Sequence, residues 1–237
     1  MLKGKPRKGA AEFLISTQLK ERQDGTVVVK DGWSPEHGPR EDGVAHDQQV
    51  VRELFRSILA AAATLGIDDN FTREVARVEP KLLGDKIGSW GQLQEWEADR
   101  DVKGDDHRHT SHLYAVYPGT TISRKDTPEL AEAARVALAG RATTGDSRRE
   151  WVWVWRAILW ARLGDGAKAG EMLENLLRYN TLDNMLATHP PFQCDGILGM
   201  VGSVCEILLE GAIPPQWPHG SATGLRTREG KTINVSW

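Results

Sequence analysis

Apolar residues recur at three- and four-residue steps along most of the chain, which is the period of an amphipathic helix. The clearest run lies between Ala45 and Gly66, where the glycine is a typical helix end. The same period predicts further helices over residues 70–83, 128–140, 151–163, 166–179 and 199–209. The pattern therefore predicts an all-α body made of helical hairpins.

Start signals support two of these helices. Thr127 and Pro128 supply a cap and a first-turn proline. Ser147 and Glu150 have the spacing of a capping box ahead of the helix at 151–163. We expect both helices to begin at these signals.

The residue composition changes after Gly211, where a proline-rich stretch leads to a short β-prone tail at residues 232–237. Residues 213–237 are therefore predicted to be the first strands of a further domain. Upstream, long motif-bearing loops join the hairpins without a short repeat period. This arrangement favours a partial α/α toroid over a TPR or HEAT solenoid.

Composition narrows the class of protein. The 237 residues are 40% hydrophobic and 27% charged, which excludes a disordered chain. The net charge of -3 provides no field for nucleic acid. We expect no membrane span, and no signal peptide at the basic start. The chain as it stands would then be cytoplasmic, while the sequence leaves open both its actual localisation and the export of longer relatives. Cys194 and Cys205 are expected to be free, buried thiols.

Nine tryptophans stand against three tyrosines and four phenylalanines. Tryptophan offers a large apolar face and one donor, which suits stacking on a sugar ring, although core packing explains a tryptophan equally well. Polar and aromatic groups gather in loops at residues 33–39, 90–96 with 107–114, and 190–196. Each loop is expected to precede a helix. In a barrel of hairpins such loops would surround one cavity.

Several of these motifs resemble glycoside hydrolase family 95, whose best-known members are inverting α-L-fucosidases, with some α-L-galactosidases. The motifs occur in the family's order at residues 34–39 (SPEHGP), 91–96 (GQLQEW), 107–114 (HRHTSHLY), 117–119 (YPG), 159–163 (LWARL) and 190–196 (PPFQCDG). Residues 217–226 also resemble the entry into the family's C-terminal β domain. The resemblance implies a partial (α/α)6 catalytic domain over residues 1–212 and the start of a β domain over 213–237.

The resemblance implies a catalytic pair, with Glu36 as general acid and Asp195 as the carboxylate that helps to activate water. Inversion requires such a pair, with the two carboxyls roughly 6.5–9.5 Å apart. Glu36 should then have a raised pKa. The alternatives are a surface carboxylate beside a proline turn for Glu36 and a helix-capping aspartate for Asp195.

Histidines at 107, 109 and 112, with Asp105 or Asp106 nearby, invite a zinc interpretation, but their spacing matches no strong zinc signature. We expect neither a metal nor a cofactor. The resemblance instead implies that His109 or His112 binds sugar hydroxyls, and packing is the alternative for these histidines. The remaining residues predicted to line the pocket are Gln92, Trp90 and Trp96. Gln94 and Glu95 are expected to cap a helix or face solvent.

Two departures from the family matter. The upstream β domain, the first barrel helices and the segment with water-orienting asparagines lie outside this sequence, and Ile197 follows Asp195-Gly196 where asparagine is frequent. The first hypothesis is an α-L-fucosidase-like hydrolase that acts on a fucosylated oligosaccharide or glycan, with weak or absent hydrolysis by this chain alone. The second is a truncated, catalytically silent homologue that binds carbohydrate or assembles with a partner chain or in an oligomer over exposed helix faces.

Overall fold

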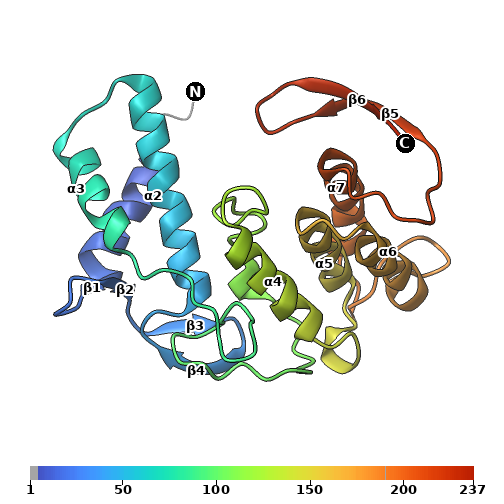
Figure 1. Ribbon diagram of the computed structural model, residues 1–237, viewed down its shortest axis with the longest axis horizontal. Coiled ribbons are helices and arrows are strands. Elements are labelled where there is room, and N and C mark those ends of the chain that lie inside the picture. Colours follow the sequence, from blue (N-terminus) through green and yellow to red (C-terminus); the bar gives the residue numbers. More distant parts are fainter. Residues whose placement is uncertain (1–4, 190) are drawn as a thin grey trace. The chain divides into compact units, whose positions relative to one another are not determined.

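The computed structural model describes residues 5–189 and 191–237. Within them, seven α-helices carry most of the regular structure, and six short strands form three antiparallel pairs (Figure 1). The predominance of helices confirms the predicted all-α class and agrees with a partial toroid of hairpins. The chain divides into two compact units. Unit 1 comprises the residues up to Asp101 together with Thr110–Ile122, and unit 2 comprises Val102–His109 and Ser123–Trp237.

Unit 1 contains the helices α1 (Lys5–Phe13), α2 (Ala45–Leu65) and α3 (Asn70–Val78). α2 ends as predicted, because Gly66 adopts a left-handed φ of 64° and its amide bonds to the carbonyls of the last turn. α3 is shorter than the predicted 70–83. A 3₁₀ turn at Glu79–Lys81 replaces its end, because Pro80 at the second position of this turn cannot continue an α-helix.

Four short strands complete unit 1. β1 (Leu19–Glu21) pairs with β2 (Val27–Val29), and β3 (Gly32–Ser34) pairs with β4 (His37–Glu41). Two 3₁₀ turns, Glu79–Lys81 and Ser111–Leu113, and a π-turn at Leu14–Gln18 make up the rest of its regular structure. The β3–β4 hairpin occupies the first motif-bearing loop, which it converts from the expected irregular loop into a tight turn.

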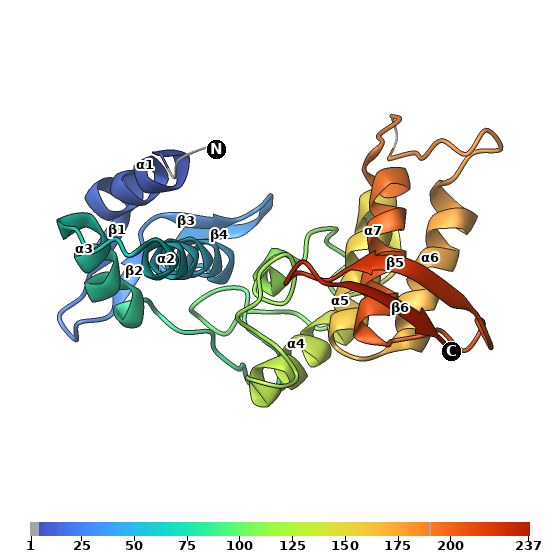
Figure 2. The same cartoon turned by 90° about the horizontal axis from the view of Figure 1, so that it is seen from above.

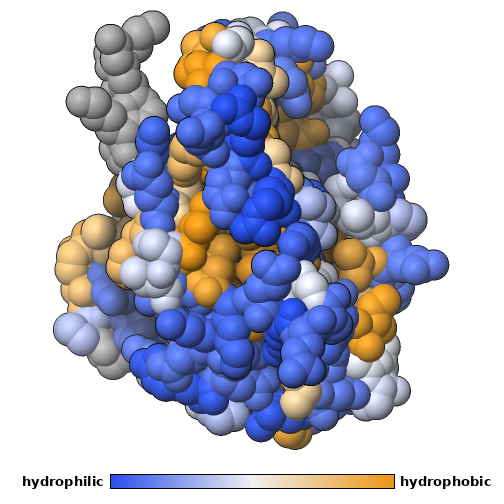
Figure 3. All heavy atoms as spheres, turned by 90° about the vertical axis from the view of Figure 1, so that its left-hand side faces the viewer, coloured by the Kyte–Doolittle hydropathy of each residue, from blue (hydrophilic) through white to orange (hydrophobic). Residues whose placement is uncertain are grey.

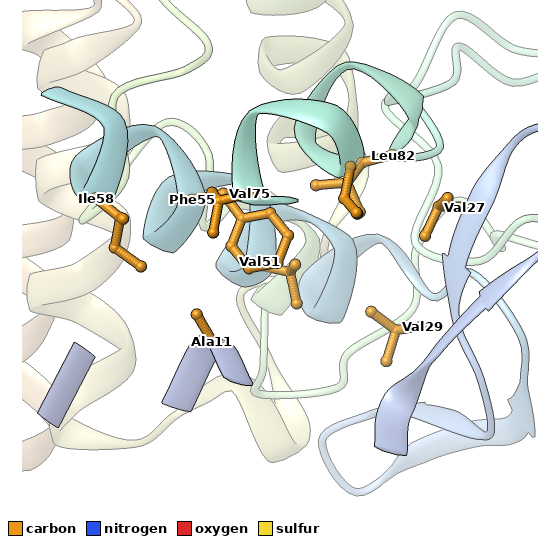
Figure 4. Packing of buried hydrophobic residues seen from close by; sticks show 9 residues of the cluster. Ala11, Val27, Val29, Val51, Phe55, Ile58, Val75 and Leu82 are labelled. Carbon is orange, nitrogen blue, oxygen red and sulfur yellow. The ribbon is translucent and has the colours of Figure 1, made fainter. Parts of the chain in front are cut away.

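The core of unit 1 is a cluster of apolar side chains from α1, β2, α2 and α3 that converge on Phe55 (Figure 4). Phe55 and Val75 are completely buried. The other members are Ala11, Val27, Val29, Val51, Ile58, Val78 and Leu82. The face of the molecule drawn in Figure 3 is mostly hydrophilic, with a band of apolar surface between the polar side chains. The cluster packs the middle of α2, the helix that follows the β3–β4 hairpin.

Unit 2 contains the helices α4 (Pro128–Gly140), α5 (Glu150–Arg162), α6 (Gly166–Asn180) and α7 (Asp195–Glu210). α5 packs against both α6 and α7, as Figures 1 and 2 show. Because it is covered on two sides, α5 buries ten of its 13 residues, and Trp153 and Leu159 are fully enclosed. This set of three helices carries Asp195 at the start of α7.

The predicted capping box at Ser147 and Glu150 is wrong. Arg149 occupies the N-cap position of α5 and makes no side-chain cap. Ser147 belongs to a 3₁₀ turn at Gly145–Ser147, and its hydroxyl donates to the carbonyl of Asp106 at 2.8 Å. The helix at 199–209 also begins earlier than predicted, at Asp195.

The tail forms the predicted strands, β5 (Ser221–Arg226) and β6 (Thr232–Ser236), which pair as an antiparallel hairpin grouped with unit 2. The boundary at residues 212 and 213 stays a prediction. Both cysteines are free thiols, as expected, but neither is buried: Cys194 is exposed and Cys205 is partly exposed. Across the described residues, no helix combines the length and the hydropathy needed to span a membrane.

Candidate functional site

Glu36 lies at the tip of the β3–β4 hairpin. Ser34 pairs with His37, so that Pro35 and Glu36 alone form the turn. Glu36 is exposed and has a φ of +56°. This is a left-handed backbone conformation that residues other than glycine rarely adopt. Proline followed by a residue with positive φ is the pattern of a type II turn, which normally places glycine at this second position. A glutamate held there is consistent with a functional constraint.

The indole of Trp96 packs against the β3–β4 hairpin. A Cβ atom on Gly38 would lie 2.3 Å from Cζ2 of Trp96, so only glycine allows the indole to approach the strand this closely. The rings of His37 and Trp96 have centroids 5.2 Å apart. Trp33, which is 39% exposed, donates from Nε1 to the carbonyl of Gly38 at 3.1 Å. Trp96 itself is 5% exposed, so little of its surface is open to a ligand.

A buried polar network lies behind the Glu36 turn. The hydroxyl of Ser34 donates a short hydrogen bond to Oε1 of Glu95. The second carboxylate oxygen of Glu95 lies 3.5 Å from Nδ1 of His112, and both side chains are almost completely buried. The expectation that Gln94 and Glu95 cap a helix or face solvent is wrong, since both are buried. Glu95 instead connects Ser34, at the end of β3 beside the Glu36 turn, to the 3₁₀ turn that carries His112.

His112 is held from its backbone as well. Gln49 of α2 donates from Nε2 to the carbonyl of His112 at 2.7 Å, and its Oε1 accepts from the amide of Ala115 at 2.9 Å. The same Nε2 lies 2.7 Å from Oδ1 of Asp85, which pairs with Arg52. These contacts fix the 3₁₀ turn at Ser111–Leu113 against α2. Sugar binding by His112 stays a prediction.

Gln92 and Trp90 form a local loop structure. Gln92 is fully buried, its Nε2 donates to Oδ1 of Asp99 at 2.8 Å, and its Oε1 accepts from the amide of Trp90 at 3.2 Å. Trp90 is partly buried and its Nε1 lies 3.4 Å from the carbonyl of Asp101. Of the predicted pocket residues in unit 1, Trp90 keeps the largest exposed surface for a ligand.

In unit 2, His109 belongs to an aromatic row. Its ring lies 4.9 Å from that of Trp151 and 5.2 Å from that of His107, and Trp151 lies 6.2 Å from Trp155. His109 and both tryptophans are partly exposed. The row therefore offers imidazole donors beside an apolar face, a combination that suits a sugar ring.

The loop that carries His107 and His109 is anchored to α5 by Arg156. This buried guanidinium donates to the carbonyl of Ala142 at 2.7 Å, to the hydroxyl of Ser147 at 2.9 Å and to the carbonyl of His107 at 3.4 Å. Burial and the nearby Arg141 lower the pKa of Arg156 to about 9. The described residues contain no group of three or more His, Cys, Asp or Glu side chains arranged to hold a metal ion.

Asp195 is the first residue of α7 and is exposed. Cys194 occupies the N-cap position and makes no side-chain cap, so Asp195 is not the capping residue that the alternative interpretation expected. Bridges between Thr188 and Phe192 and between Thr181 and Ala187 order the preceding loop. Asp195 is thus presented at a helix N-terminus, where the dipole favours a carboxylate.

Glu150 lies beneath Asp195 and was not among the predicted site residues. It is completely buried, and the pKa of its carboxyl is raised to about 7, mainly by burial and also by the negative charge of Asp195. The backbone amide of Gly196 opposes this rise without offsetting it. No local sequence signal reveals this contact, because Glu150 is the first residue of an apolar helix and resembles an ordinary first-turn glutamate.

The structure therefore organises the predicted residues in two sets. Glu36, Trp90, Gln92, Trp96 and His112 belong to unit 1, while His109 and Asp195 belong to unit 2. Within unit 1, Glu95 connects Ser34, next to the Glu36 turn, to His112. The pairing of Glu36 with Asp195 across one cavity stays a prediction.

Comparison with known proteins identifies the relatives. Residues 6–208 match the glycosyl hydrolase family 95 catalytic domain. The chain is 37% identical to a protein named "Probable alpha-fucosidase A" from Aspergillus niger, over 97% of this chain and 33% of that protein. It is 31% identical to "Alpha-L-fucosidase 2" from Arabidopsis thaliana, over 97% of this chain and 30% of that protein.

A third relative, "Probable alpha-fucosidase A" from Aspergillus oryzae, is 30% identical over 90% of this chain and 34% of its own length. The chain thus spans about a third of the length of each of these curated relatives.

Proposed function

Because the chain belongs to glycoside hydrolase family 95, we propose that it carries the general acid and the general base of an α-L-fucosidase-like hydrolase. The proposed substrate is a terminal α-linked L-fucose, or L-galactose, on an oligosaccharide. The names of the three relatives support the fucoside, and the matched region contains both proposed catalytic carboxyls.

The proposed reaction is hydrolysis with inversion. Glu36, in its protonated form, gives a proton to the leaving glycosidic oxygen. Asp195 accepts a proton from the water that attacks the anomeric carbon from the opposite face of the ring. The two carboxyls would then be roughly 6.5–9.5 Å apart, with water and sugar between them.

The Glu36 turn is the observation that carries this proposal. A glutamate with positive φ, exposed at the tip of a two-residue turn, is held by Trp96 below and stands beside the Ser34–Glu95 hydrogen bond. A rigid turn suits a general acid, because misplacement of a reacting group by about 1 Å can cost on the order of a hundredfold in rate. In unit 2, His109 and Trp151 would contact the hydroxyls and the apolar face of the sugar.

The test is release of L-fucose from 2'-fucosyllactose by the purified chain. Glu36→Gln, which cannot donate a proton, and Asp195→Asn, which cannot accept one, should each abolish turnover. Matched controls are Glu129→Gln on the exposed start of α4 and Asp183→Asn in the exposed loop before α7, and both should leave the rate unchanged. Turnover that survives Glu36→Gln would remove Glu36 from the acid role.

Equilibrium binding of the same trisaccharide separates the second hypothesis from the first. Binding by the unsubstituted chain without any release of fucose would favour a carbohydrate-binding homologue. Binding together with turnover that Glu36→Gln abolishes favours the hydrolase.

A further inference from the structure

The burial of Glu150 is not explained by packing alone. The residue is 0% exposed, and within the part of the chain that the structure describes neither of its carboxylate oxygens makes a hydrogen bond of normal geometry, although the amide of Gly196 is close enough to favour the ionised form. Buried carboxyls in folded proteins are nearly always paired, because an unpaired charge is expensive to bury. A carboxyl left in this state at the start of α5 calls for a role.

The first turn of α7 is shaped around this side chain. A Cβ atom on Gly196 would lie 2.1 Å from Oε2 of Glu150 and 2.9 Å from its Cβ, so no larger residue fits there. Gly196 directly follows Asp195. The position of Asp195 therefore depends on how its neighbour packs against Glu150.

The contact continues one turn further along both helices. A Cβ on Gly199 would lie 2.8 Å from Cγ2 of Val154, and the hydroxyl of Ser203 donates to the carbonyl of Val154 at 3.0 Å. Glu150 and Val154 are four residues apart and so lie on one face of α5. α5 thus sets the register of α7 at two successive turns, and only the turn under Asp195 involves an ionisable group.

The groups around Glu150 compensate the negative charge of its ionised form poorly. From α7 it faces the carboxylate of Asp195 and the amide of Gly196, and burial together with Asp195 raises its pKa to about 7. The adjacent Arg149 is engaged elsewhere, since its guanidinium binds Asp146 at 2.9 Å and the carbonyl of His189 at 3.3 Å. Both protonation states of Glu150 are therefore populated near neutrality.

We propose that Glu150 is a positioning residue for Asp195. The neutral carboxyl of Glu150 allows the first turn of α7 to pack against α5, and its ionisation displaces that turn. The neutral acid places no charge beneath Asp195. The ionised form places a second carboxylate there, which repels Asp195 and is itself driven toward water. This inference rests on the proposed role of Asp195 as the base.

The test follows the amide of Leu198, which donates to the carbonyl of Cys194 at 3.0 Å in the first turn of α7, in the full chain labelled with ¹⁵N-glycine and ¹⁵N-leucine. The protection of this amide against hydrogen exchange, corrected for the intrinsic pH effect, should fall as the pH rises through about 7, the pKa of Glu150. In Glu150→Gln, a neutral side chain of the same shape, protection should stay high over the whole range. Glu174→Gln, on the exposed face of α6, should behave like the unsubstituted chain.

Asp195→Asn provides a second measurement. Asp195 raises the pKa of Glu150 through charge repulsion, so removing its negative charge should lower that pKa. The ionised Glu150 then meets no opposing carboxylate at position 195. The midpoint of the Glu150 titration, read from the shift of the Gly196 amide signal, should therefore move to lower pH while protection is lost less completely.

The outcomes separate the two ideas. Protection that does not depend on pH in the unsubstituted chain, or that depends on pH equally in Glu150→Gln, overturns the inference. Should Glu150→Gln not fold, Glu150→Met, neutral and of similar length, serves the same comparison. If the amide behaves as expected but Asp195→Asn still releases fucose at the full rate, the proposed base is wrong and the positioning by Glu150 stands.

Discussion

At the scale of single residues, Glu36 shows a conflict between backbone and side chain. Its φ of +56° suits glycine, whereas its proposed role needs a carboxyl. A residue with a Cβ in the left-handed region costs on the order of 1–2 kcal/mol. A position that is kept at this cost is expected to contribute to something other than stability.

Glu36→Gly should therefore stabilise the chain by up to about 1 kcal/mol, after the greater flexibility of glycine in the unfolded chain is allowed for, and should abolish hydrolysis. Urea-induced unfolding measures the first effect and release of fucose measures the second. Glu36→Gln is the control, because it keeps the strained Cβ and should leave the free energy of unfolding unchanged. A destabilised Glu36→Gly would show that the glutamate side chain supports the turn.

Glu150 predicts an unusual pH dependence of stability. Its pKa is about 7 in the folded chain against an ordinary value of 4.5, so the folded state binds the proton more tightly than the unfolded state does. The stability that this group contributes is then full below about pH 4.5 and declines as the pH rises to about 7. Glu150→Gln should remove this decline and be more stable at pH 8, by about 1–2 kcal/mol once solvent screening is allowed for.

The difference in unfolding free energy between the two chains, measured at several pH values, isolates Glu150 from every titratable group that the two chains share. Asp146 marks the opposite case. Burial raises its pKa, but hydrogen bonds from Arg108 and Arg149 outweigh this and lower the pKa to about 2. Its contribution to stability is present above about pH 4 and is lost only in stronger acid, outside the window in which Glu150 acts. A flat difference curve between pH 4.5 and 7 would contradict the assignment of Glu150.

The sequence revealed some of these residues and not others for a physical reason. Pro35 marks the Glu36 turn locally, and the motifs around it are contiguous. Glu95 reaches Ser34, which is 61 positions away, and Glu150 contacts Gly196 across α5 and α7. Local pattern gives no information about such contacts, so Glu95 was expected to face solvent and Glu150 to cap a helix.

At the scale of elements, the helical period was a sound guide wherever one face of a helix is buried. It located α2, α4, α5 and α6 closely, and glycine or proline marks the end of α2 at Gly66 and the start of α4 at Pro128. The strands β1 to β4 are three to five residues long, too short for alternation to distinguish them from loops. The capping box failed because the Ser147 hydroxyl is used by the carbonyl of Asp106 and by Arg156.

The β3–β4 hairpin gives a prediction about an element. Gly38→Ala would place a Cβ 2.3 Å from the Trp96 ring at a φ of +62°. We expect it to destabilise unit 1 by about 1–3 kcal/mol from overpacking, in addition to about 1 kcal/mol from the positive φ. Urea-induced unfolding measures the total.

Gly25→Ala is the matched control for this substitution. Gly25 has a φ of +83° but no atom within 4 Å of the added Cβ, so this variant carries the backbone cost alone. Equal losses in the two variants would show that Trp96 does not brace the hairpin.

At the scale of the whole molecule, the open question is whether the two units serve one ligand. Glu36 lies in unit 1 and Asp195 in unit 2. Their pairing depends on how the units are arranged, and no motif or period in the sequence encodes that arrangement directly. The order of the motifs within the family is what supports a single site.

A single site predicts that one ligand responds to changes in both units. At about 100 times its dissociation constant, a ligand stabilises the folded chain by about 2.7 kcal/mol, which raises the unfolding temperature by roughly 5–10 °C for a chain of this size. L-fucose should produce such a shift, and the shift should shrink both in Trp90→Ala of unit 1 and in His109→Ala of unit 2. D-glucose is the control ligand and should have no effect. A shift that responds to substitutions in only one unit would place the sugar within that unit and would separate Glu36 from Asp195, because a shared site loses affinity whichever wall is damaged.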